Sequence, residues 1–207
     1  GGTTGFHGEK TAPWEGGYRI PMLMRAPAAI EAGTISNGIV SLEDMLPTIM
    51  GIMGEPDIKE QLKEGYEVGD MTYKVHLDGY NFVPFLTEED EKWPRREFFY
   101  FTDDGSLAAL RLDAWKVMFL EQRAEGFDVW AEPFVQLRLP KVFNLRSDPL
   151  EKALHESWGY QRWHFDHAFI LVPAQVIAQK FMSTFAEFPP RQKPGSFSIE
   201  SADAVMT

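Results

Sequence analysis

The second half of the chain contains four short aromatic and aliphatic runs separated by turn signals, and this pattern constrains the fold more than any other feature. The runs are residues 97–102, 107–112, 114–120 and 141–145. Runs of this length bounded by turn residues predict β-strands, and the turn Asp103-Asp104-Gly105 supplies a glycine where a positive φ is needed. We therefore predict a small antiparallel sheet of four strands, one face of which needs a cover.

Residues 172–188 predict the helix that supplies this cover. Pro173 suits the first turn, and four apolar side chains recur at helical spacing. These side chains are Val176, Ile177, Phe181 and Phe185. Pro189 and Pro190 end the helix, and residues 191–207 are expected to be a loosely held tail.

The first half is less regular. A short apolar run at residues 20–24 predicts a buried strand, with a possible return at Ile39 and Val40. Residues 41–54 predict a helix that ends at Gly54. If Ser41 is its N-cap, Pro47 lies past the first turn and costs the helix a hydrogen bond. If Asp44 is its N-cap, Pro47 lies in the first turn, where its missing N–H is harmless. We favour Asp44.

Charge and composition limit the partners and the chemistry. The charge run Glu88-Glu89-Asp90-Glu91-Lys92 predicts a solvated connection, so we place the domains at 1–92 and 93–207. A net charge of -11 repels a phosphate backbone, and no nucleic acid is expected. No uninterrupted apolar window reaches about 18 residues, so we expect no membrane span. The absence of cysteine removes thiolate ligands and cysteine nucleophiles.

Two clusters of polar residues have structural interpretations. His164 and His167 lie in an aromatic segment, where packing is a better expectation than metal binding. Asp103 and Asp104 are expected to be turn residues because Gly105 follows them.

The segment 8–21 is unusual for a structural element. It carries Lys10, Trp14 and Glu15 between glycines, and the Gly16-Gly17 pair permits close approach to another backbone or a ligand. Spacing alone favours a surface lysine on a tight connection.

This segment and four others resemble the C-terminal portion of bacterial arylsulfatases, members of the sulfatase family in the alkaline phosphatase superfamily. The first of these segments is GGTTGFHGEKTAPWEGGYRIPMLMRAP. It contains an aromatic-Glu-Gly-Gly-x-Arg-x-Pro sequence that starts at Trp14, and Lys10 lies four residues before Trp14. The resemblance continues through residues 41–54, 77–86, 126–149 and 166–175, and together these segments cover nearly the whole chain.

The resemblance implies an α/β fold, in which residues 1–92 are the C-terminal part of a sulfatase α/β sandwich domain. Residues 93–207 are then a small domain with an antiparallel four-stranded sheet under a C-terminal helix. It also implies that the complete parent enzyme hydrolyses a small-molecule sulfate ester with a divalent metal, Ca²⁺, and a formylglycine made in a C/S-x-P-x-R motif.

That motif is absent, because the nearest string, 147–151, has Glu151 where the motif has arginine. We expect a fragment that lacks the nucleophile and the metal ligands and is inactive alone. The missing N-terminal part of the same polypeptide would be its partner.

By its position in the motif, Lys10 corresponds to the lysine that contacts the substrate sulfate, and an ammonium there would stabilise the charge on the leaving oxygen. His7 is a second candidate for the pocket, although an exposed imidazole is the simpler expectation. Residues 15–19 would fix the lysine loop on the strand at Ile20, and the aromatic segment 158–170 would reach the mouth of the site. A phosphonate monoester or phosphodiester hydrolase and a non-catalytic binding domain remain alternatives.

Overall fold

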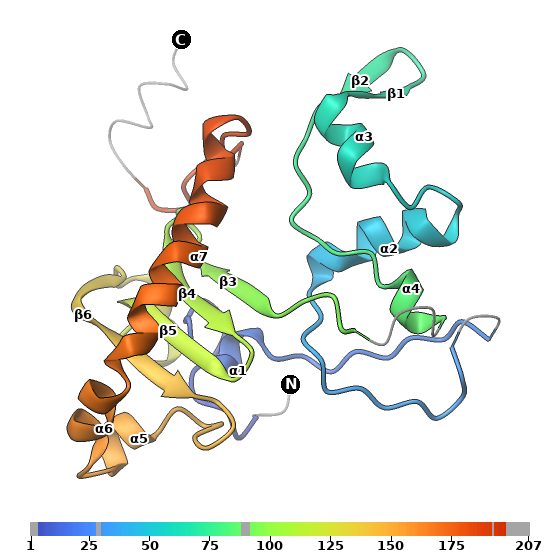
Figure 1. The fold of residues 1–207 in the computed structure, drawn as a ribbon. Helices are drawn as coiled ribbons and strands as arrows, with labels where there is room; N and C mark the ends of the chain where they lie inside the picture. The colour runs from blue at the N-terminus through green and yellow to red at the C-terminus, as the bar shows by residue number, and fades with distance from the viewer. Residues whose placement is uncertain (1–3, 28–29, 88–91, 192, 198–207) are drawn as a thin grey trace. The chain divides into compact units, whose positions relative to one another are not determined.

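The computed structural model describes residues 4–27, 30–87, 92–191 and 193–197 (Figure 1). The chain forms two compact units. One combines Gly1–Ile20 with Phe99–Thr207, and the other is Pro21–Phe98. The expected acidic connection 88–91 lies outside the described residues, and the domain division at residue 92 stays a prediction.

The unit that contains the C-terminal half is built on the predicted antiparallel sheet. Its four strands follow in the order β3-β4-β5-β6. They are β3 (Glu97–Phe101), β4 (Leu107–Leu112), β5 (Trp115–Glu121) and β6 (Val135–Asn144). The last strand starts six residues before the predicted run at Lys141. Gly105 has the predicted positive φ, at 80°.

Residue alternation gives the sheet two different faces. Leu110 pairs with Val117, and Val117 pairs with Val142, so these three apolar side chains share one face. One residue along, Lys116 pairs with Arg111 and with Phe143 on the opposite face. The sheet therefore has an apolar side and a side that carries buried charge.

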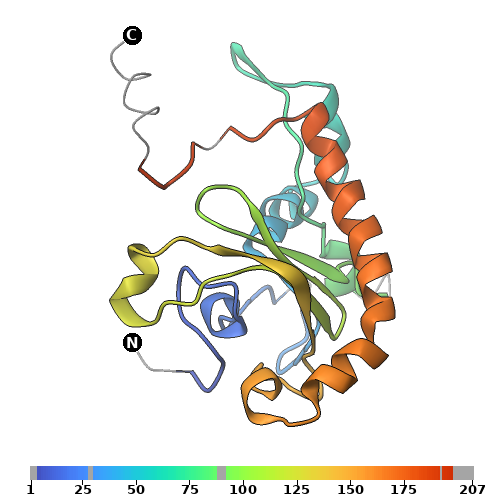
Figure 2. The same cartoon turned by 90° about the vertical axis from the view of Figure 1, so that its left-hand side faces the viewer.

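The C-terminal helix covers the apolar side, as predicted. Helix α7 (Leu171–Ser183), flanked by η3 (Ala168–Ile170) and η4 (Thr184–Ala186), runs along the sheet (Figure 2). Ala174 and Ile177 pack against the core cluster of Leu110, Val117 and Val142. Phe181 stacks on Phe99 at 3.9 Å between ring centroids. Val176, by contrast, is 60% exposed, so it does not belong to the buried stripe.

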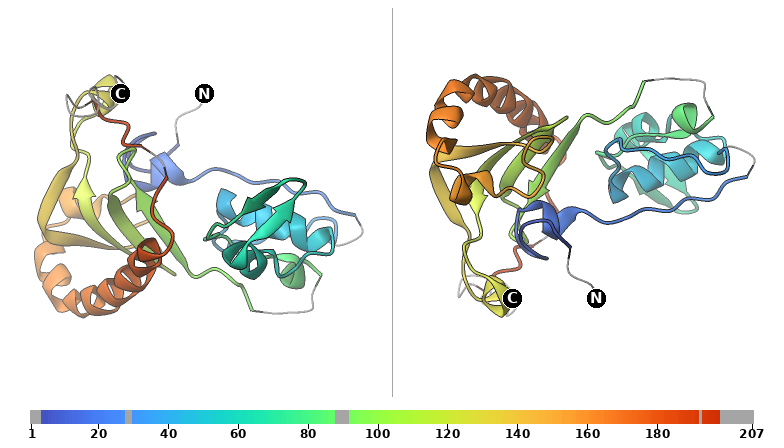
Figure 3. Two further views of the ribbon diagram at one scale, coloured as in Figure 1. Left: turned by 90° about the horizontal axis from the view of Figure 1, so that it is seen from above. Right: turned by 90° about the horizontal axis from the view of Figure 1, so that it is seen from below.

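The other face of the sheet is covered by the N-terminal segment, which contains the short helix α1 (Glu15–Tyr18) (Figure 3). The sequence predicts no helix in this segment. Helix α1 forms because Arg19 N–H bonds back to the Glu15 carbonyl at 2.8 Å. Trp14 lies edge-on against Phe143 of β6, at 5.9 Å between centroids.

The remaining helical turns of this unit lie between β5 and β6 and after β6. They are η2 (Gly126–Trp130), α5 (Ala153–Glu156) and α6 (Tyr160–Asp166). Of the expected loose tail, Gly195 and Ser196 hydrogen-bond Asp103 and Asp104 in the β3–β4 turn. Residues 192 and 198–207 lie outside the described part.

The unit Pro21–Phe98 consists of short elements. They are η1 (Leu42–Asp44), α2 (Met45–Ile52), α3 (Ile58–Glu64), the hairpin β1 (Tyr66–Val68) and β2 (Met71–Tyr73), and α4 (Val83–Leu86). The predicted strand at residues 20–24 does not form. No neighbouring strand pairs with it among the described residues, and Leu23 is 99% exposed.

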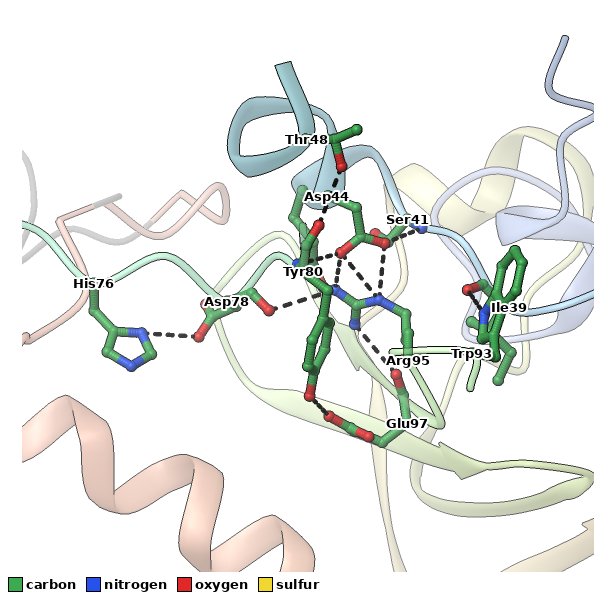
Figure 4. A network of polar contacts seen from close by, with 11 residues as sticks. Ile39, Ser41, Asp44, Thr48, His76, Asp78, Tyr80, Trp93, Arg95 and Glu97 are labelled. Carbon is green, nitrogen blue, oxygen red and sulfur yellow. Dashed lines mark hydrogen bonds and ion pairs between the residues drawn. The ribbon is translucent and has the colours of Figure 1, made fainter. Parts of the chain in front are cut away.

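A buried carboxylate–guanidinium pair holds this unit together (Figure 4). Asp44 and Arg95 are 0% and 2% exposed, and their closest contact is 2.5 Å. The Asp44 carboxylate also accepts the backbone N–H groups of Ser41 at 2.8 Å and Tyr80 at 2.7 Å. Removing one partner of such a buried pair costs roughly 3–5 kcal/mol, because the other charge is left uncompensated.

The favoured helix start is confirmed. Asp44 occupies the N-cap position of α2, and Pro47 lies in the first turn, where its missing N–H is harmless. The Asp44 side chain, however, makes no cap bond to α2. Its carboxylate belongs to a capping box at the short turn η1, of which Ser41 is the N-cap.

One helical stretch in the described residues, Ala168–Ala186, is long and apolar enough to cross a membrane, with a mean hydropathy of 1.3. Length and composition alone do not distinguish a membrane span from a helix that covers a sheet. The contacts of Ala174 and Ile177 with the sheet favour the second interpretation.

Candidate functional site

The loop that carries Lys10 depends on the absence of side chains at its glycines. Gly16 N–H donates to the His7 carbonyl at 2.7 Å. A Cβ atom on Gly16 would lie 2.3 Å from the Gly8 carbonyl oxygen, and one on Gly17 would lie 2.6 Å from the Glu9 carbonyl oxygen. The expected close approach of backbone to backbone is thus confirmed, and it folds residues 7–17 into a compact turn.

A buried ionic network fixes this loop to the sheet. Glu15 is 1% exposed, and its carboxylate accepts from the Tyr100 hydroxyl at 2.5 Å and the Lys116 ammonium at 3.2 Å. Lys116 also donates to Glu151 at 2.7 Å, and the second Glu151 oxygen accepts the Glu15 N–H at 2.7 Å. Lys116 and Glu151 are both 0% exposed.

Further cations surround the Glu15 carboxylate. Arg19 lies at 2.6 Å and Arg111 at 3.5 Å. Burial raises the pKa of Glu15, but Lys116, Tyr100 and Arg19 outweigh burial and lower it to about 2. Burial raises the pKa of Glu151, although Lys116 and the Glu15 N–H oppose the increase. Glu15 is therefore ionised at neutral pH.

The anchor differs from the one predicted. We expected residues 15–19 to fix the loop on a strand beginning at Ile20, but the partners lie on β5 and in the turn after β6. Sequence reasoning missed Lys116 and Glu151, because a lysine within an apolar strand is the only local signal. Glu151, treated as the mismatch in a chance motif, has φ of 54° and is fully buried.

An open cavity of about 1010 Å³ lies beside this loop, within the same unit. Its lining includes both expected site residues, Lys10 and His7. The other side chains around it come from the loop, from the end of β5 and the residues that follow it, from β6 and from α5. They include Glu9, Trp14, Glu121, Arg123, Glu125, Lys141 and His155.

Lys10 is exposed at this cavity, and no carboxylate neutralises it within ion-pair distance in the described part of the chain. Its Nζ atom lies 5.4 Å from the centroid of the Trp130 ring. The neighbouring cations are paired: Lys141 bonds Glu121, and Arg123 contacts the same carboxylate at 3.0 Å. Lys10 is thus the cation of this lining that remains available to an anion.

His7 is half-buried, which corrects the simpler expectation of an exposed imidazole. Its ring stacks on Trp14 at 4.1 Å and meets the His155 ring edge-on at 6.4 Å. Burial lowers the pKa of His7, and His155 lowers it further. The imidazole is therefore neutral at neutral pH and offers the cavity a hydrogen-bonding group rather than a charge.

The aromatic segment 158–170 packs instead of reaching the cavity lining. Trp163 stacks on Trp115 at 6.0 Å and on His167 at 4.5 Å. His164 is buried against Tyr160, with centroids 5.7 Å apart. These ring contacts agree with the packing role expected for the two histidines.

The described residues do not assemble the acidic side chains of a Ca²⁺ site. Calcium takes six to eight oxygen ligands, and the described residues contain no group of three or more His, Cys, Asp or Glu side chains placed to hold a metal ion. The sequence also contains no cysteine and no C/S-x-P-x-R string.

Comparison with known proteins places the lysine loop in a sulfatase context. Residues 1–55 match the family model described as Sulfatase. The chain is 24% identical to Arylsulfatase G of Homo sapiens over 150 residues, which are 72% of this chain and 27% of that protein. It is 30% identical to Arylsulfatase of Hemicentrotus pulcherrimus over 176 residues, 75% of this chain and 29% of that protein.

The fold agrees with a solved sulfatase. The crystal structure of PsFucS1 sulfatase from Pseudoalteromonas sp. matches with a TM-score of 0.64 and 24% identity. The match covers 89% of this chain and 33% of that chain. The fold is therefore that of part of a sulfatase, α/β with an antiparallel sheet under a C-terminal helix. The chain spans less than a third of the curated relatives that it matches.

Proposed function

We propose that the complete protein hydrolyses sulfate esters and that Lys10 contacts the sulfate group of the substrate. One observation carries the proposal: the Lys10 ammonium, which has no carboxylate partner among the residues that the structure describes, lines an open cavity on a loop held by a buried ionic network. The similarity to arylsulfatases over 72–75% of the chain supports the choice of a sulfate ester over other anions.

The chemical role of Lys10 follows from where charge develops. Cleavage of the S–O bond leaves negative charge on an oxygen, and a positioned cation stabilises that charge more than mobile water does. A single donor of this kind is worth roughly 3–4 kcal/mol in the transition state. The buried Glu15–Lys116–Glu151 network keeps the loop in one place, so the ammonium is oriented before substrate binds.

His7 is proposed as the second group of this chain at the substrate. Its neutral imidazole, held flat against Trp14, offers a nitrogen to a sulfate oxygen without adding charge.

The nucleophile and the metal of this proposal belong to other residues of the complete polypeptide. None of the 207 residues supplies a formylglycine precursor in its motif. We propose that Ca²⁺ and the formylglycine are held outside them, and that these residues act by binding and orienting the sulfate.

A substrate panel tests the proposal. The complete gene product is assayed with 4-nitrophenyl sulfate and with a 4-nitrophenyl phosphonate monoester of the same leaving group. Faster hydrolysis of the sulfate supports the proposal. Faster hydrolysis of the phosphonate replaces it with the related phosphonate or phosphodiester hydrolase, and no hydrolysis of either favours a non-catalytic binding domain.

A further inference from the structure

The turn that carries Lys10 has a backbone conformation that its sequence does not favour. The Ala12 N–H donates to the Glu9 carbonyl at 3.1 Å, so residues 9–12 form a β-turn with Lys10 second and Thr11 third. Thr11 has a φ of 74°, whereas the φ of Lys10 is not positive. This pattern is that of a type II turn, whose third position normally holds glycine. A β-branched residue at a positive φ is a genuine conformational outlier.

The surrounding contacts hold Thr11 in this conformation. On one side of the turn, the Glu9 carboxylate accepts the Gly126 N–H at 2.8 Å. On the other side, Ala12 and Trp14 are each 4% exposed, so the chain that leaves the turn is fixed in the core. Because both ends of the turn are held, Thr11 stays in the left-handed region although this region is unfavourable for it.

Backbone strain is concentrated around the lysine loop. Among the described residues, three that are not glycine have a positive φ, namely Thr11, Asp113 and Glu151. Thr11 directly follows Lys10, and Glu151 is the buried carboxylate that accepts the Glu15 N–H of the same loop. Strained residues persist where the surrounding structure determines one conformation, and they cluster at functional sites. Two of the three strained residues therefore belong to the lysine loop or to its anchor.

The side chain of Thr11 limits the movement of the turn in two ways. Its hydroxyl donates to the Lys10 carbonyl at 2.5 Å and so fixes the peptide group between these two residues. Its branched Cβ leaves only a small left-handed region open, whereas glycine would adopt a wide range of backbone angles. The cavity lining includes Glu9, Lys10 and Ala12 but not Thr11. Any effect of Thr11 on an anion in the cavity therefore passes through the position of Lys10.

We infer that Thr11 is a positioning residue, whose strained conformation holds the Lys10 ammonium where negative charge develops in the reaction. The inference rests on the proposed function and deepens it, because it names the residue that orients the sulfate contact. Such a contact stabilises the transition state most when its place is set in advance, and a displacement of about 1 Å lowers rates by up to about two decades. Glycine at this position would relieve the strain and let the ammonium move.

The kinetic test compares variants of the complete gene product with 4-nitrophenyl sulfate. Thr11→Gly should lower kcat by about twofold to fivefold, which corresponds to the extra backbone freedom of glycine, with little change in KM. The melting temperature should not fall, because the relieved strain offsets the greater freedom of the unfolded chain. Thr11→Asn should retain more of kcat than Thr11→Gly, since asparagine tolerates the left-handed region and still restricts the backbone.

Asp113→Gly is the matched control. Asp113 also has a positive φ, at 51°, but it lies between β4 and β5 and outside the cavity lining. Its backbone carbonyl, which accepts from Arg111 at 2.9 Å, is kept in the variant, so kcat should not change. Three results would overturn the inference: wild-type kcat in Thr11→Gly, an equal loss in Asp113→Gly, or a loss of kcat in Thr11→Gly that comes with a lower melting temperature.

Hydrogen exchange separates failure of this inference from failure of the proposed function. Exchange of the Ala12 amide proton, which is bonded to the Glu9 carbonyl, is followed in the complete gene product and corrected for the intrinsic rate of each sequence. Thr11→Gly should speed this exchange by about twofold to fivefold, and Asp113→Gly should not. If no sulfate is hydrolysed but exchange is faster in Thr11→Gly, the proposed function fails and the turn is still held by Thr11. Unchanged exchange would overturn the inference whatever the activity.

Discussion

Replacing Lys116 with methionine should destabilise the unit that holds the lysine loop more than any surface change. Lys116 is 0% exposed and lies between two buried carboxylates, 3.2 Å from Glu15 and 2.7 Å from Glu151. At an effective dielectric constant of about 20, each contact represents a gross attraction of about 5–6 kcal/mol, most of which offsets the cost of burying the charges.

The variant removes the attraction and leaves the burial cost. Glu15 and Glu151 then face each other in the interior, and loss of one partner from a buried ion pair costs roughly 3–5 kcal/mol. Urea unfolding at pH 7, followed by near-ultraviolet circular dichroism, should show a loss of this size. Lys63→Met is the control, because Lys63 pairs with Glu60 at the surface, and its loss should change stability by less than about 1 kcal/mol.

The pH dependence distinguishes lost charge compensation from lost packing. Near pH 4.5 the variant should take up a proton on one of the two carboxyls, which relieves the repulsion and reduces the difference from wild type. Adding Glu151→Gln to Lys116→Met should recover a substantial part of the loss at pH 7. A loss below about 1 kcal/mol, or one that is the same at both pH values, would refute the reasoning.

Three further predictions follow from the same structure. The pKa of Glu15 is about 2, against an ordinary value of 4.5, so its carboxylate contributes stability above about pH 4.5 that disappears as the pH falls toward 2. The difference in unfolding free energy between wild type and Glu15→Gln should therefore shrink from pH 4.5 to pH 2. A constant difference would contradict this pKa. Gly16→Ala should displace the lysine loop, because its Cβ would lie 2.3 Å from the Gly8 carbonyl oxygen, and the melting temperature should fall by several degrees. Gly54→Ala is the control: its Cβ would meet no neighbouring atom, so this variant measures the cost of a positive φ alone. The 207-residue chain by itself should hydrolyse no aryl sulfate. It should also bind an apolar dye through exposed side chains such as Leu23 and Met53, which are 99% and 73% exposed. A chain that does not change the fluorescence of the dye would show that these surfaces are covered in solution.

The sheet and its helix were predictable because their signals are local. Alternation and turn residues mark the strands around Gly105, and the spacing of Ile177, Phe181 and Phe185 marks the helix that packs on them. Each of these patterns is complete within a few residues, so no knowledge of distant partners is needed.

The strand expected at residues 20–24 failed because an apolar run forms a strand only where another strand pairs with it. The run around Leu23 has the apolar composition of a strand, but no strand among the described residues pairs with it. The helix start after Asp44 was predictable, but the role of the Asp44 side chain was not. Its carboxylate is held by Arg95, which lies 51 residues away in the sequence.

The site itself was partly predictable. The resemblance of the loop predicts Lys10 as the sulfate contact, which stays a prediction, and the structure places Lys10 at an open cavity. The glycines around it have the close contacts that their positions implied. The anchor formed by Lys116 and Glu151 was not predictable, because its members are 35 residues apart and neither has a local pattern. Ion pairs of this kind become visible only when the strands are placed in register.

The proposed sulfate contact is tested most directly by the turnover of Lys10→Ala in the complete gene product with 4-nitrophenyl sulfate. Loss of one charge-stabilising donor should lower kcat by about two decades or more, with an unchanged melting temperature because Lys10 is exposed. Lys152→Ala, another exposed lysine, should retain wild-type turnover. If Lys10→Ala turns over the sulfate as fast as Lys152→Ala does, Lys10 does not contact the reacting group and the central claim is wrong.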